Sequence, residues 1–427
     1  MKKINVLIFP AGEMNSIELH DALSHQVNIE VFGCSSVDRH GEYVFKNYRS
    51  GLPNIVEPNF IDEFNKLIQE WKIDYVFPTH DTVALYFSKN QMAIGAKVIV
   101  ASYETTKICR DKRLTYETFS DCAFLPEQYN GFDKLPVFIK PRTGQGGRGV
   151  KLINVVDDIP TDFVIDEYTI SEYLPGEEMT VDCLTDANGE LRACLPRTRD
   201  RVMAGICVAG KKRDLSEEVK SIAIEINTRL KFFGLWYFQL KKSADGRFKL
   251  LEISTRCAGT MCFSRARGVN LPLLSIYIAA GLDVTTFENS YNIKMDRAFI
   301  ARYRIDYDYE KVYLDYDDTV INGNMVILST IAFLYQCRNK GIEVILLTRH
   351  ESYHEDTVED SLRSHEIEQS LFSAIIKISG RAQKADYITG KSIFIDNSYD
   401  ERKKVHEILN IPVFDVEGIA VLEDWRC

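Results

Sequence analysis

The chain has 427 residues, of which 45% are hydrophobic and 27% charged, and its formal net charge is −10. This length predicts two to four domains, and the composition is that of a soluble globular protein. The negative charge argues against a nucleic-acid backbone or an anionic membrane as partner, and no apolar run is long enough to span a membrane. The ten cysteines include no Cys-x-x-Cys pair, so neither a zinc site nor a disulfide framework is indicated, and a cytoplasmic location is expected.

The first hundred residues predict a doubly wound α/β domain. Ile4 to Phe9 is a continuous apolar run, which we interpret as a buried strand and not as a signal peptide, because it is short and lacks a cleavage pattern. Gly12 and a helical pattern follow, as in a βα unit. This first turn, PAGEMNS, lacks G-x-G-x-x-G, so NAD is not inferred. Further strands are expected at Ile29 to Phe32, Tyr75 to Phe77 and Val98 to Ala101, with a helix at Ile61 to Trp71.

Asp81 is the candidate polar residue of this domain. It lies in Pro78-Thr-His-Asp81, directly after a predicted strand, where strand ends face a ligand cleft. The alternative is that Asp81 caps the N-terminus of the next helix. The sequence leaves both interpretations open.

From about residue 105 the pattern changes to a helix that carries Lys107 and Lys112, and then to strands. The segment VFIKPRTGQGGRGV, Val137 to Val150, has a strand-like run ending in Lys140 and then four glycines. Such loops expose backbone N–H groups to phosphate oxygens, with a lysine as counter-charge. Taken alone, the segment is equally consistent with a nucleotide-phosphate site and with a plain flexible loop. The loop glycines are Gly144, Gly146, Gly147 and Gly149.

Three arginines alternate in Pro196-Arg-Thr-Arg-Asp-Arg, which predicts guanidinium groups of Arg197, Arg199 and Arg201 on one strand face. A guanidinium fork suits a carboxylate or an acyl phosphate. The alternative is a solvated edge strand, which often carries charge.

A β-hairpin is predicted from Trp236 to Arg256, because two alternating apolar runs flank Ser-Ala-Asp-Gly. Gln239 and Glu252 would then face each other, with Ser254 and Arg256 following on the same face. Oxygen ligands in such a row suit Mg²⁺. The alternative, which the hairpin taken alone favours, is an ordinary amphipathic hairpin with its polar residues on the solvent face. Arg256, beside Glu252, is the arginine most suited to hold a reacting group.

Together these segments resemble the ATP-grasp superfamily, and in particular its carbamoyl-phosphate-synthase-like carboxylate-amine ligases, over roughly residues 1 to 290. The matching segments keep the family's order along the chain. They are Cys109 to Lys112, Lys140 with its glycine loop, ISEYLPGEEMTVD from Ile170 to Asp182, Gln239, Glu252 to Arg256, and Gly268 to Pro272.

The resemblance implies ATP and Mg²⁺ or Mn²⁺ as cofactors. Lys112, Lys140, Gly146 and Gly147 would contact the ATP phosphates, the backbone of Glu172, Tyr173 and Leu174 would hold adenine, and Glu178 would take the ribose. Gln239 and Glu252 would bind the metal. Ser254 is a third candidate ligand, although the family commonly has Asn at that position.

After a polar boundary at Asp296 to Lys311, an apolar strand leads into Asp315 and Asp317. Two aspartates two residues apart lie on the same side at a strand end, where one can attack phosphorus while the other protonates the leaving group, with Mg²⁺ screening the charge. Val344 to Leu347 is a second strand ending in Thr348. Ser392 to Ile395 is a third, ending in Asp396, with Lys384 before it.

This set resembles the haloacid dehalogenase (HAD) superfamily of phosphohydrolases over roughly residues 310 to 427. The resemblance implies Asp315 as nucleophile, Asp317 as general acid/base, Thr348 as phosphate ligand and Lys384 as counter-charge. Asp315, Asp317 and Asp396 would form the metal site, although many members have a second acid where this chain has Asn397. Only about 30 residues separate Asp317 from Thr348, too few for a large cap domain, which predicts an open site.

The predicted fold class is therefore α/β and α+β multidomain: a Rossmann-like domain preceding the ATP-grasp fold at residues 1–104, an ATP-grasp domain at 105–300, and a HAD-like domain without a large cap at 310–427. The expected function is a ligase that joins a small-molecule carboxylate to an amine, fused to a phosphatase acting on a phosphorylated metabolite. A homodimer is one assembly to test. Two alternatives stay open: a phosphatase with a degenerate nucleotide-sensing module, or a ligase with a non-catalytic HAD-like interaction module.

Overall fold

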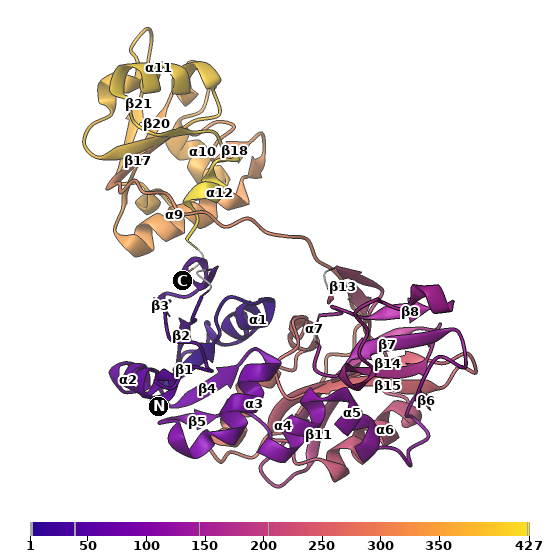
Figure 1. Ribbon diagram of the computed structural model, residues 1–427. Helices are drawn as coiled ribbons and strands as arrows, with labels where there is room; N and C mark the ends of the chain where they lie inside the picture. Colours follow the sequence, from indigo (N-terminus) through magenta and orange to yellow (C-terminus); the bar gives the residue numbers. More distant parts are fainter. Residues whose placement is uncertain (1–2, 38–39, 145, 204, 425, 427) are drawn as a thin grey trace. The chain divides into compact units, whose positions relative to one another are not determined.

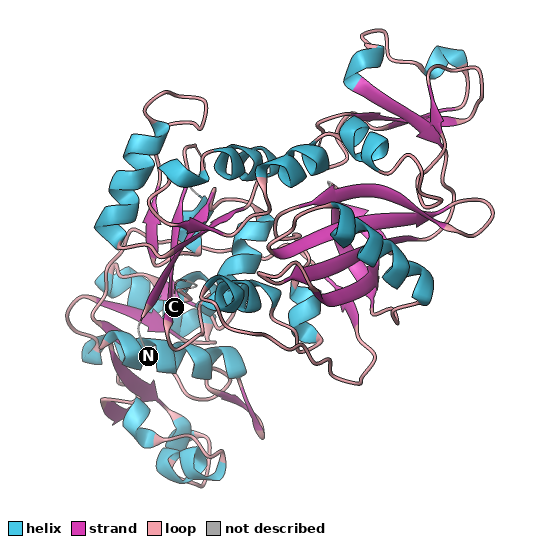
Figure 2. Cartoon of the chain, turned by 90° about the horizontal axis from the view of Figure 1, so that it is seen from below, coloured by secondary structure: helices cyan, strands magenta, loops and turns pink. Residues whose placement is uncertain are grey.

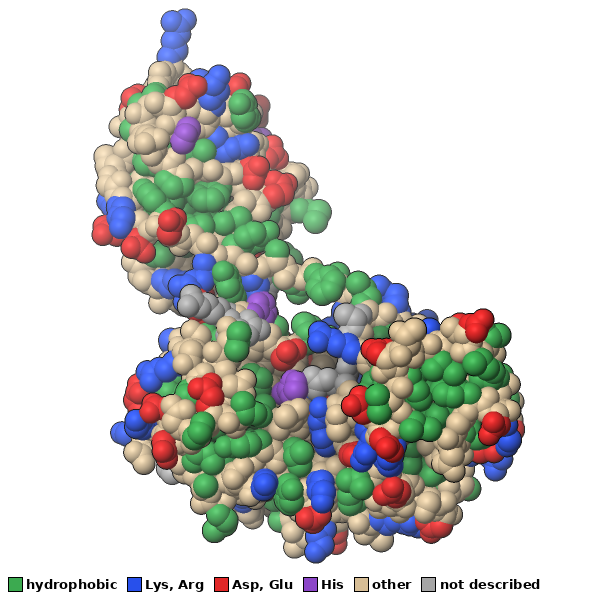
Figure 3. Space-filling model, in the orientation of Figure 1, with side chains coloured by type: hydrophobic (Ala, Val, Ile, Leu, Met, Phe, Trp, Pro, Cys, Tyr) green, Lys and Arg blue, Asp and Glu red, His purple; other side chains and the backbone are tan. Residues whose placement is uncertain are grey.

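The computed structural model describes residues 3–37, 40–144, 146–203, 205–424 and 426. The chain forms two compact units, residues 1–299 and 300–427, each with hydrophobic clusters of its own (Figure 1). All described cysteines are free. Among the described residues, no helix is long and apolar enough to cross a membrane. On the face shown in Figure 3, basic and acidic side chains are interspersed.

The first sheet is parallel, with strand order β3-β2-β1-β4-β5. Its central strand β1 is apolar because both faces are covered: α1 packs on the side of Val6 and Ile8, and α2 and α3 pack on the side of Leu7 and Phe9. The strands are β1 Ile4–Phe9, β2 Ile29–Cys34, β3 Asn47–Arg49, β4 Tyr75–Pro78 and β5 Lys97–Val98, and the helices are α1 Met14–Leu23, α2 Phe60–Trp71 and α3 Asp81–Lys89.

The last strand is shorter than the predicted Val98 to Ala101. Its neighbour β4 ends at Pro78, which has no N–H to continue the ladder, and the chain then leads into α4 while remaining buried.

Two helices, not the predicted single one, carry Lys107 and Lys112. The helices are α4 Tyr103–Arg110 and α5 Lys112–Thr118. The break falls at Asp111, whose carboxylate accepts a hydrogen bond from the Arg113 backbone N–H and so caps α5. As a result, Lys112 is the first residue of a helix.

A small antiparallel sheet follows, in the order β6-β9-β7-β8. It carries Lys140 near the end of β7, and the glycine-rich loop connects β7 to β8. Its strands are β6 Gln128–Tyr129, β7 Val137–Pro141, β8 Lys151–Ile153 and β9 Tyr168–Glu172.

A larger antiparallel sheet, β11-β10-β14-β15, holds the predicted hairpin as its β14–β15 pair. One face packs against α6, because Val181, Phe238 and Ile253 share a cluster with the apolar residues of that helix (Figure 2). The bounds are β10 Glu178–Thr185, β11 Leu191–Thr198, α6 Glu217–Arg229, β14 Gly234–Lys242 and β15 Phe248–Ser254, and α7 Cys262–Ala266 and α8 Leu271–Ala279 follow.

A third sheet separates the arginines that were predicted to share one strand face. β11 ends at Thr198, so only Arg197 lies in it, and Arg199 lies beyond its end. Arg201 begins β12 and pairs at the surface with Asp296 of β16. The strands of this sheet are β12 Arg201–Met203, β13 Ile206–Lys211 and β16 Lys294–Asp296, in the order β12-β13-β16.

The second unit has a parallel sheet in the order β21-β20-β17-β22-β23. Only a short hairpin and α9 lie between Asp317 and β20, so no cap-sized insertion occurs there. The elements are β17 Lys311–Leu314, β18 Ile321–Asn322, β19 Met325–Val326, α9 Leu328–Lys340, β20 Glu343–Thr348, α10 Val358–Ser364, β21 Ala374–Lys377, β22 Ser392–Ile395, α11 Tyr399–Leu409, β23 Val413–Phe414 and α12 Ile419–Leu422.

Candidate active site

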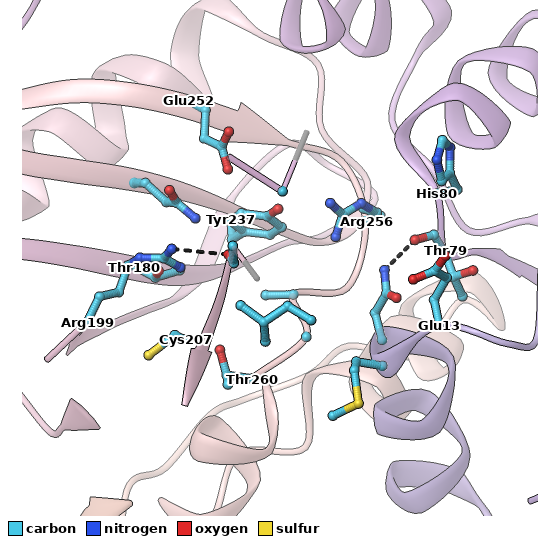
Figure 4. A pocket seen from close by; sticks show the side chains of 18 of the residues that line it. Glu13, Thr79, His80, Thr180, Arg199, Cys207, Tyr237, Glu252, Arg256 and Thr260 are labelled. Carbon is cyan, nitrogen blue, oxygen red and sulfur yellow. Dashed lines mark hydrogen bonds between the residues drawn. The ribbon is translucent and has the colours of Figure 1, made fainter. Parts of the chain in front are cut away.

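A row of polar side chains crosses all four strands of the larger sheet of the first unit. Arg197 is paired with Thr180, Thr180 with Gln239, and Gln239 with Glu252. Residues directly opposite each other on neighbouring strands lie on the same face of a sheet. The four residues line a cavity of about 320 Å³. In Figure 4, Glu13, Thr79 and His80 of the first domain lie on the side of this cavity opposite Arg199 and Thr180.

A smaller cavity shares Gly146, Glu252 and Arg256 with the first and adds Lys112 and Gly144. The Lys112 Nζ donates a hydrogen bond to the Gly144 carbonyl at 3.1 Å. Burial lowers the pKa of Lys112, although Glu252 acts in the opposite direction. The glycine loop, a lysine and the hairpin carboxylate therefore line one cavity.

Lys140 lies buried on β7, with its Nζ 3.4 Å from the Tyr116 hydroxyl. Burial lowers the pKa of Lys140 to about 8, against the opposing effects of Glu252 and Glu178. A second ammonium, carried by the small sheet, is therefore also influenced by Glu252.

Asp81 links the first domain to the hairpin. Its carboxylate accepts hydrogen bonds from Ser254 Oγ at 2.7 Å and from Arg256 Nη2 at 2.9 Å. Burial by itself raises the pKa of Asp81, but Arg256 and Ser254 hold it at about 2. The interpretation of Asp81 as a helix cap is wrong, because the side chain of His80 caps α3.

Three of the arginines in the cavity wall already have a carboxylate partner. Arg197 binds Asp182 at 2.9 Å, Arg199 binds Glu178 at 2.6 Å, and Arg256 binds Asp81. The expected free guanidinium forks are therefore partly occupied. Among the described residues, three buried atoms of this wall have no hydrogen-bond partner: Thr180 Oγ1, Arg197 Nη1 and Arg256 Nε.

Unpaired buried donors of this kind indicate a polar ligand, because native proteins rarely leave such groups unsatisfied. Thr180 and Asp182 were not singled out in the sequence. Their spacing of two on a predicted strand, opposite Arg197, was the available signal.

The residues expected around the nucleotide base lie at the end of β9. Glu172 is its last residue, and its carboxylate accepts a hydrogen bond from the Glu127 backbone N–H. Tyr173 is partly exposed and Leu174 is buried. Glu178, expected at the ribose, is the partner of Arg199, so its carboxylate is already engaged in a salt bridge.

In the second unit, Lys384 joins two strand ends. Its Nζ lies 2.7 Å from Asp315 Oδ1 and 2.6 Å from Asp396 Oδ2. Asp315 directly follows β17 and Asp396 follows the neighbouring strand β22. Burial and the nearby Asp396 raise the pKa of Asp315 to about 7. Burial alone lowers the pKa of Lys384, but the two carboxylates raise it above its ordinary value.

Asp317 and Thr348 meet through a residue that the sequence did not single out. The ring Nδ1 of His350 lies 2.8 Å from Asp317 Oδ1, and the His350 backbone N–H donates to Thr348 Oγ1 at 3.0 Å. The Asn397 side-chain oxygen accepts a hydrogen bond from Thr319 Oγ1 at 3.5 Å. The segment Thr348-Arg-His350 held the signal for His350, two residues beyond a predicted phosphate ligand.

Comparison with protein families matches residues 165–298 to a family described as "ATP-grasp in the biosynthetic pathway with Ter operon". No curated protein gives a significant sequence match. Several solved structures share the fold at low sequence identity.

Pyruvate carboxylase from Rhizobium etli is 15% identical with a TM-score of 0.54, covering 67% of this chain and 29% of that one, so this chain spans under a third of that protein. The biotin carboxylase domain of Hydrogenobacter thermophilus 2-oxoglutarate carboxylase, solved with MgADP and bicarbonate, is 15% identical with a TM-score of 0.53, covering 67% and 72%. L-amino acid ligase from Bacillus licheniformis is 14% identical with a TM-score of 0.52, covering 65% and 74%. These likenesses show an ATP-grasp fold.

Proposed function

We propose that the first unit is an ATP-dependent ligase that phosphorylates a carboxylate and lets an amine displace phosphate from the acyl phosphate, yielding an amide, ADP and phosphate. The observation that carries this proposal is the meeting of Glu252, Lys112 and the glycine loop at one cavity, with Gln239 paired to Glu252 on the neighbouring strand. The ATP-grasp fold and the similarity to an L-amino acid ligase support the same reaction class. We assign the preceding domain to residues 1–104 and the ATP-grasp domain to residues 105–300.

The donor set fits Mg²⁺, which takes one or two carboxylates and completes its octahedron with water and phosphate oxygens. Gln239 and Glu252 would hold it, and when bound it would neutralise charge on the transferring phosphoryl group. The Ser254 hydroxyl donates to Asp81, so we assign no metal to Ser254. The similar carboxylase domain that was solved with MgADP supports this choice of metal.

The protein's own cations would position the nucleotide. Lys112 and Lys140 approach from α5 and β7 and would counter the phosphate charge from two directions. Arg256, fixed by Asp81, would present its unpaired Nε to the acyl phosphate or its carboxylate precursor. The glycine loop would supply backbone N–H groups to the phosphates.

ADP release tests the ligase. The Asp315→Asn protein, in which the second unit is silenced, is assayed with MgATP against a panel of carboxylates and amines that includes amino acids and uronic acids. ADP formation that requires one acid and amine pair, and that Glu252→Gln abolishes, supports the ligase. Measurable ATP binding without turnover for any pair favours a nucleotide-sensing module.

A second function is proposed for residues 310–427: Mg²⁺-dependent hydrolysis of a phosphomonoester. The carrying observation is the buried Asp315–Lys384–Asp396 cluster at the carboxyl ends of adjacent parallel strands, with Asp317 and Thr348 joined beside it through His350. Asp315 would attack phosphorus, Lys384 would neutralise the aspartyl phosphate, and Asp315 with Asp396 would hold the metal. A non-catalytic interaction module is the alternative.

Phosphate release from p-nitrophenyl phosphate and from the ligation product tests this second function. Asp315→Asn should abolish release and leave ATP turnover intact. Loss of both activities would contradict the assignment of two separate sites. If p-nitrophenyl phosphate is hydrolysed but the ligation product releases no phosphate, the phosphatase does not act on the product of the ligase.

A further inference from the structure

His350, which has no role in the hydrolysis proposed above, is held in place by several neighbouring side chains. The imidazole is only 3% exposed, and its edge contacts the ring of Tyr316, with centroids 5.3 Å apart at 81°. Its Nδ1 is 2.8 Å from Asp317 Oδ1. Its Nε2 has no hydrogen-bond partner among the described residues and lies 3.4 Å from Asp356 Oδ1. The ring is thus held on several sides with one nitrogen directed at Asp317.

His354 covers the remaining side of this ring. The two imidazoles are stacked, with centroids 4.4 Å apart and planes 16° from parallel. His354 Nε2 lies 3.5 Å from the same Asp317 oxygen. Asp317, His350 and His354 therefore form a compact group of possible metal ligands.

The stacking argues against one ion bound by all three. A metal ligated by imidazole lies in the plane of the ring, and two stacked rings direct their nitrogens along separate, nearly parallel planes. A shared ion would require His354 to leave the stack. The arrangement is instead that of a hydrogen-bonded carboxylate held by a packed ring.

We propose that His350 is a positioning residue for Asp317 in phosphoester hydrolysis. This inference rests on the phosphatase function proposed above. Nδ1–H of His350 donates to Oδ1 of Asp317, which leaves Oδ2 to carry the proton and face the substrate. The backbone N–H of the same residue fixes Thr348 Oγ1, so a single residue sets the acid and the phosphate ligand relative to each other.

The reaction has two halves, formation of the aspartyl phosphate and its hydrolysis. An Asp315 carboxylate oxygen forms a bond to phosphorus as the bond from phosphorus to the leaving oxygen breaks, and Asp317 Oδ2 gives its proton to that oxygen. In the second half, water attacks the aspartyl phosphate, Asp317 takes a proton from the water, and Asp315 is released with inorganic phosphate. His350 keeps its proton throughout and acts through Asp317.

Leaving-group dependence separates positioning from a merely structural role. Phenyl phosphate needs a proton on its leaving oxygen, whereas p-nitrophenyl phosphate releases a stable anion, so loss of an oriented acid slows the first much more. General acid catalysis is typically worth 10²–10⁴-fold, so we expect His350→Leu to lower kcat for phenyl phosphate roughly 30-fold or more and kcat for p-nitrophenyl phosphate by about threefold or less, with KM little changed.

His350→Asn provides the conservative rescue, because its side-chain amide N–H can reach the position of Nδ1–H. We expect this variant to restore most of the phenyl phosphate activity. His406→Leu, which removes an exposed ring from α11, is the matched control and should leave both substrates unaffected.

An equal loss for both substrates in His350→Leu would overturn the proposal, since it would indicate a structural role. Unchanged rates for both substrates would also overturn it. Equal failure of Asn and Leu at this position would also count against it. A wild-type protein inactive towards both esters, with Mg²⁺ present, would instead refute the phosphatase function on which the inference rests.

Discussion

Arg197 and Arg201 form ion pairs of the same kind in very different surroundings. The Arg197–Asp182 pair is buried, with side chains 2% and 0% exposed, whereas those of the Arg201–Asp296 pair are 48% and 69% exposed. Arg197→Met would leave Asp182 as a buried charge with Ser264 as its remaining donor, which typically costs about 3–5 kcal/mol. Arg201→Met should cost about 1 kcal/mol or less.

Urea unfolding followed by tryptophan fluorescence, to which Trp236 in the same sheet as Arg197 contributes, measures both losses. The Arg201 variant is the control for removal of a guanidinium. Similar losses of unfolding free energy in the two variants would mean that burial does not make the Arg197–Asp182 pair costlier to break.

The lowered pKa of Lys140 predicts that ATP binding depends on pH. Its pKa is lowered to about 8 by burial, and the ammonium form is the one that attracts phosphate. Below pH 8 the charged form predominates. Above pH 8 the free protein must first take up a proton to bind, so MgATP affinity should fall about tenfold between pH 7 and pH 9.

Titration calorimetry at several pH values checks this expectation. Lys140→Met should bind MgATP more weakly at pH 7, and its affinity should no longer depend on pH. Lys112→Met should also bind MgATP more weakly, but its affinity should still fall as the pH rises. A wild-type affinity that stays constant up to pH 9 would contradict the role of Lys140.

Among the elements, the glycine loop and the β12–β13 turn approach each other closely enough to exclude a side chain. Gly205 has φ +78°, and a Cβ there would overlap the Gly146 carbonyl. Gly205→Ala should therefore force the loop away from the cavity and weaken MgATP binding roughly tenfold or more, because small displacements of positioning groups are costly.

Gly189→Ala is the matched control. Gly189 has φ +84° in the β10–β11 turn, but a Cβ there meets no atom within 4 Å. Both variants should lose about 1 kcal/mol of stability from the left-handed backbone, and only Gly205→Ala should lose nucleotide affinity. Unchanged MgATP binding in Gly205→Ala would show that the loop contact is dispensable.

The elements also show how far the sequence predicts this structure. The β14–β15 hairpin and the pairing of Gln239 with Glu252 follow from alternation and a turn signal, which are local properties of the chain. The break at Asp111 and the separation of Arg201 from Arg197 were missed, because a helix cap and the end of a strand each interrupt a pattern that continues in the sequence.

The partners of the site residues were harder to predict than the residues themselves. Asp81 and Arg256 are 175 positions apart, and nothing local in either segment indicates their contact. Likewise the sequence proposes Ser254 as a metal ligand, whereas its hydroxyl donates to Asp81. Which ligand a polar side chain binds depends on the tertiary neighbours that compete for it, and those neighbours come from distant parts of the chain.

At the scale of the whole molecule, the two units are expected to fold independently. Each has its own sheets and hydrophobic clusters, and no helix or strand lies between β16 of the first unit and β17 of the second. Fragments 1–299 and 300–427 should therefore each unfold cooperatively. Their melting temperatures should match the two transitions of the full chain within about 3 °C, which corresponds to roughly 1 kcal/mol or less of mutual stabilisation.

The two proposed activities should separate in the same way. The first fragment should retain ADP formation that Glu252→Gln abolishes, and the second should retain Mg²⁺-dependent phosphatase activity that Asp315→Asn abolishes, because the residues that we propose for each site all belong to one unit. Calorimetry and the two assays check this with the full chain as reference. A fragment that folds but loses its activity would mean that one unit completes the site of the other, and the fusion would then be a single enzyme with two coupled centres.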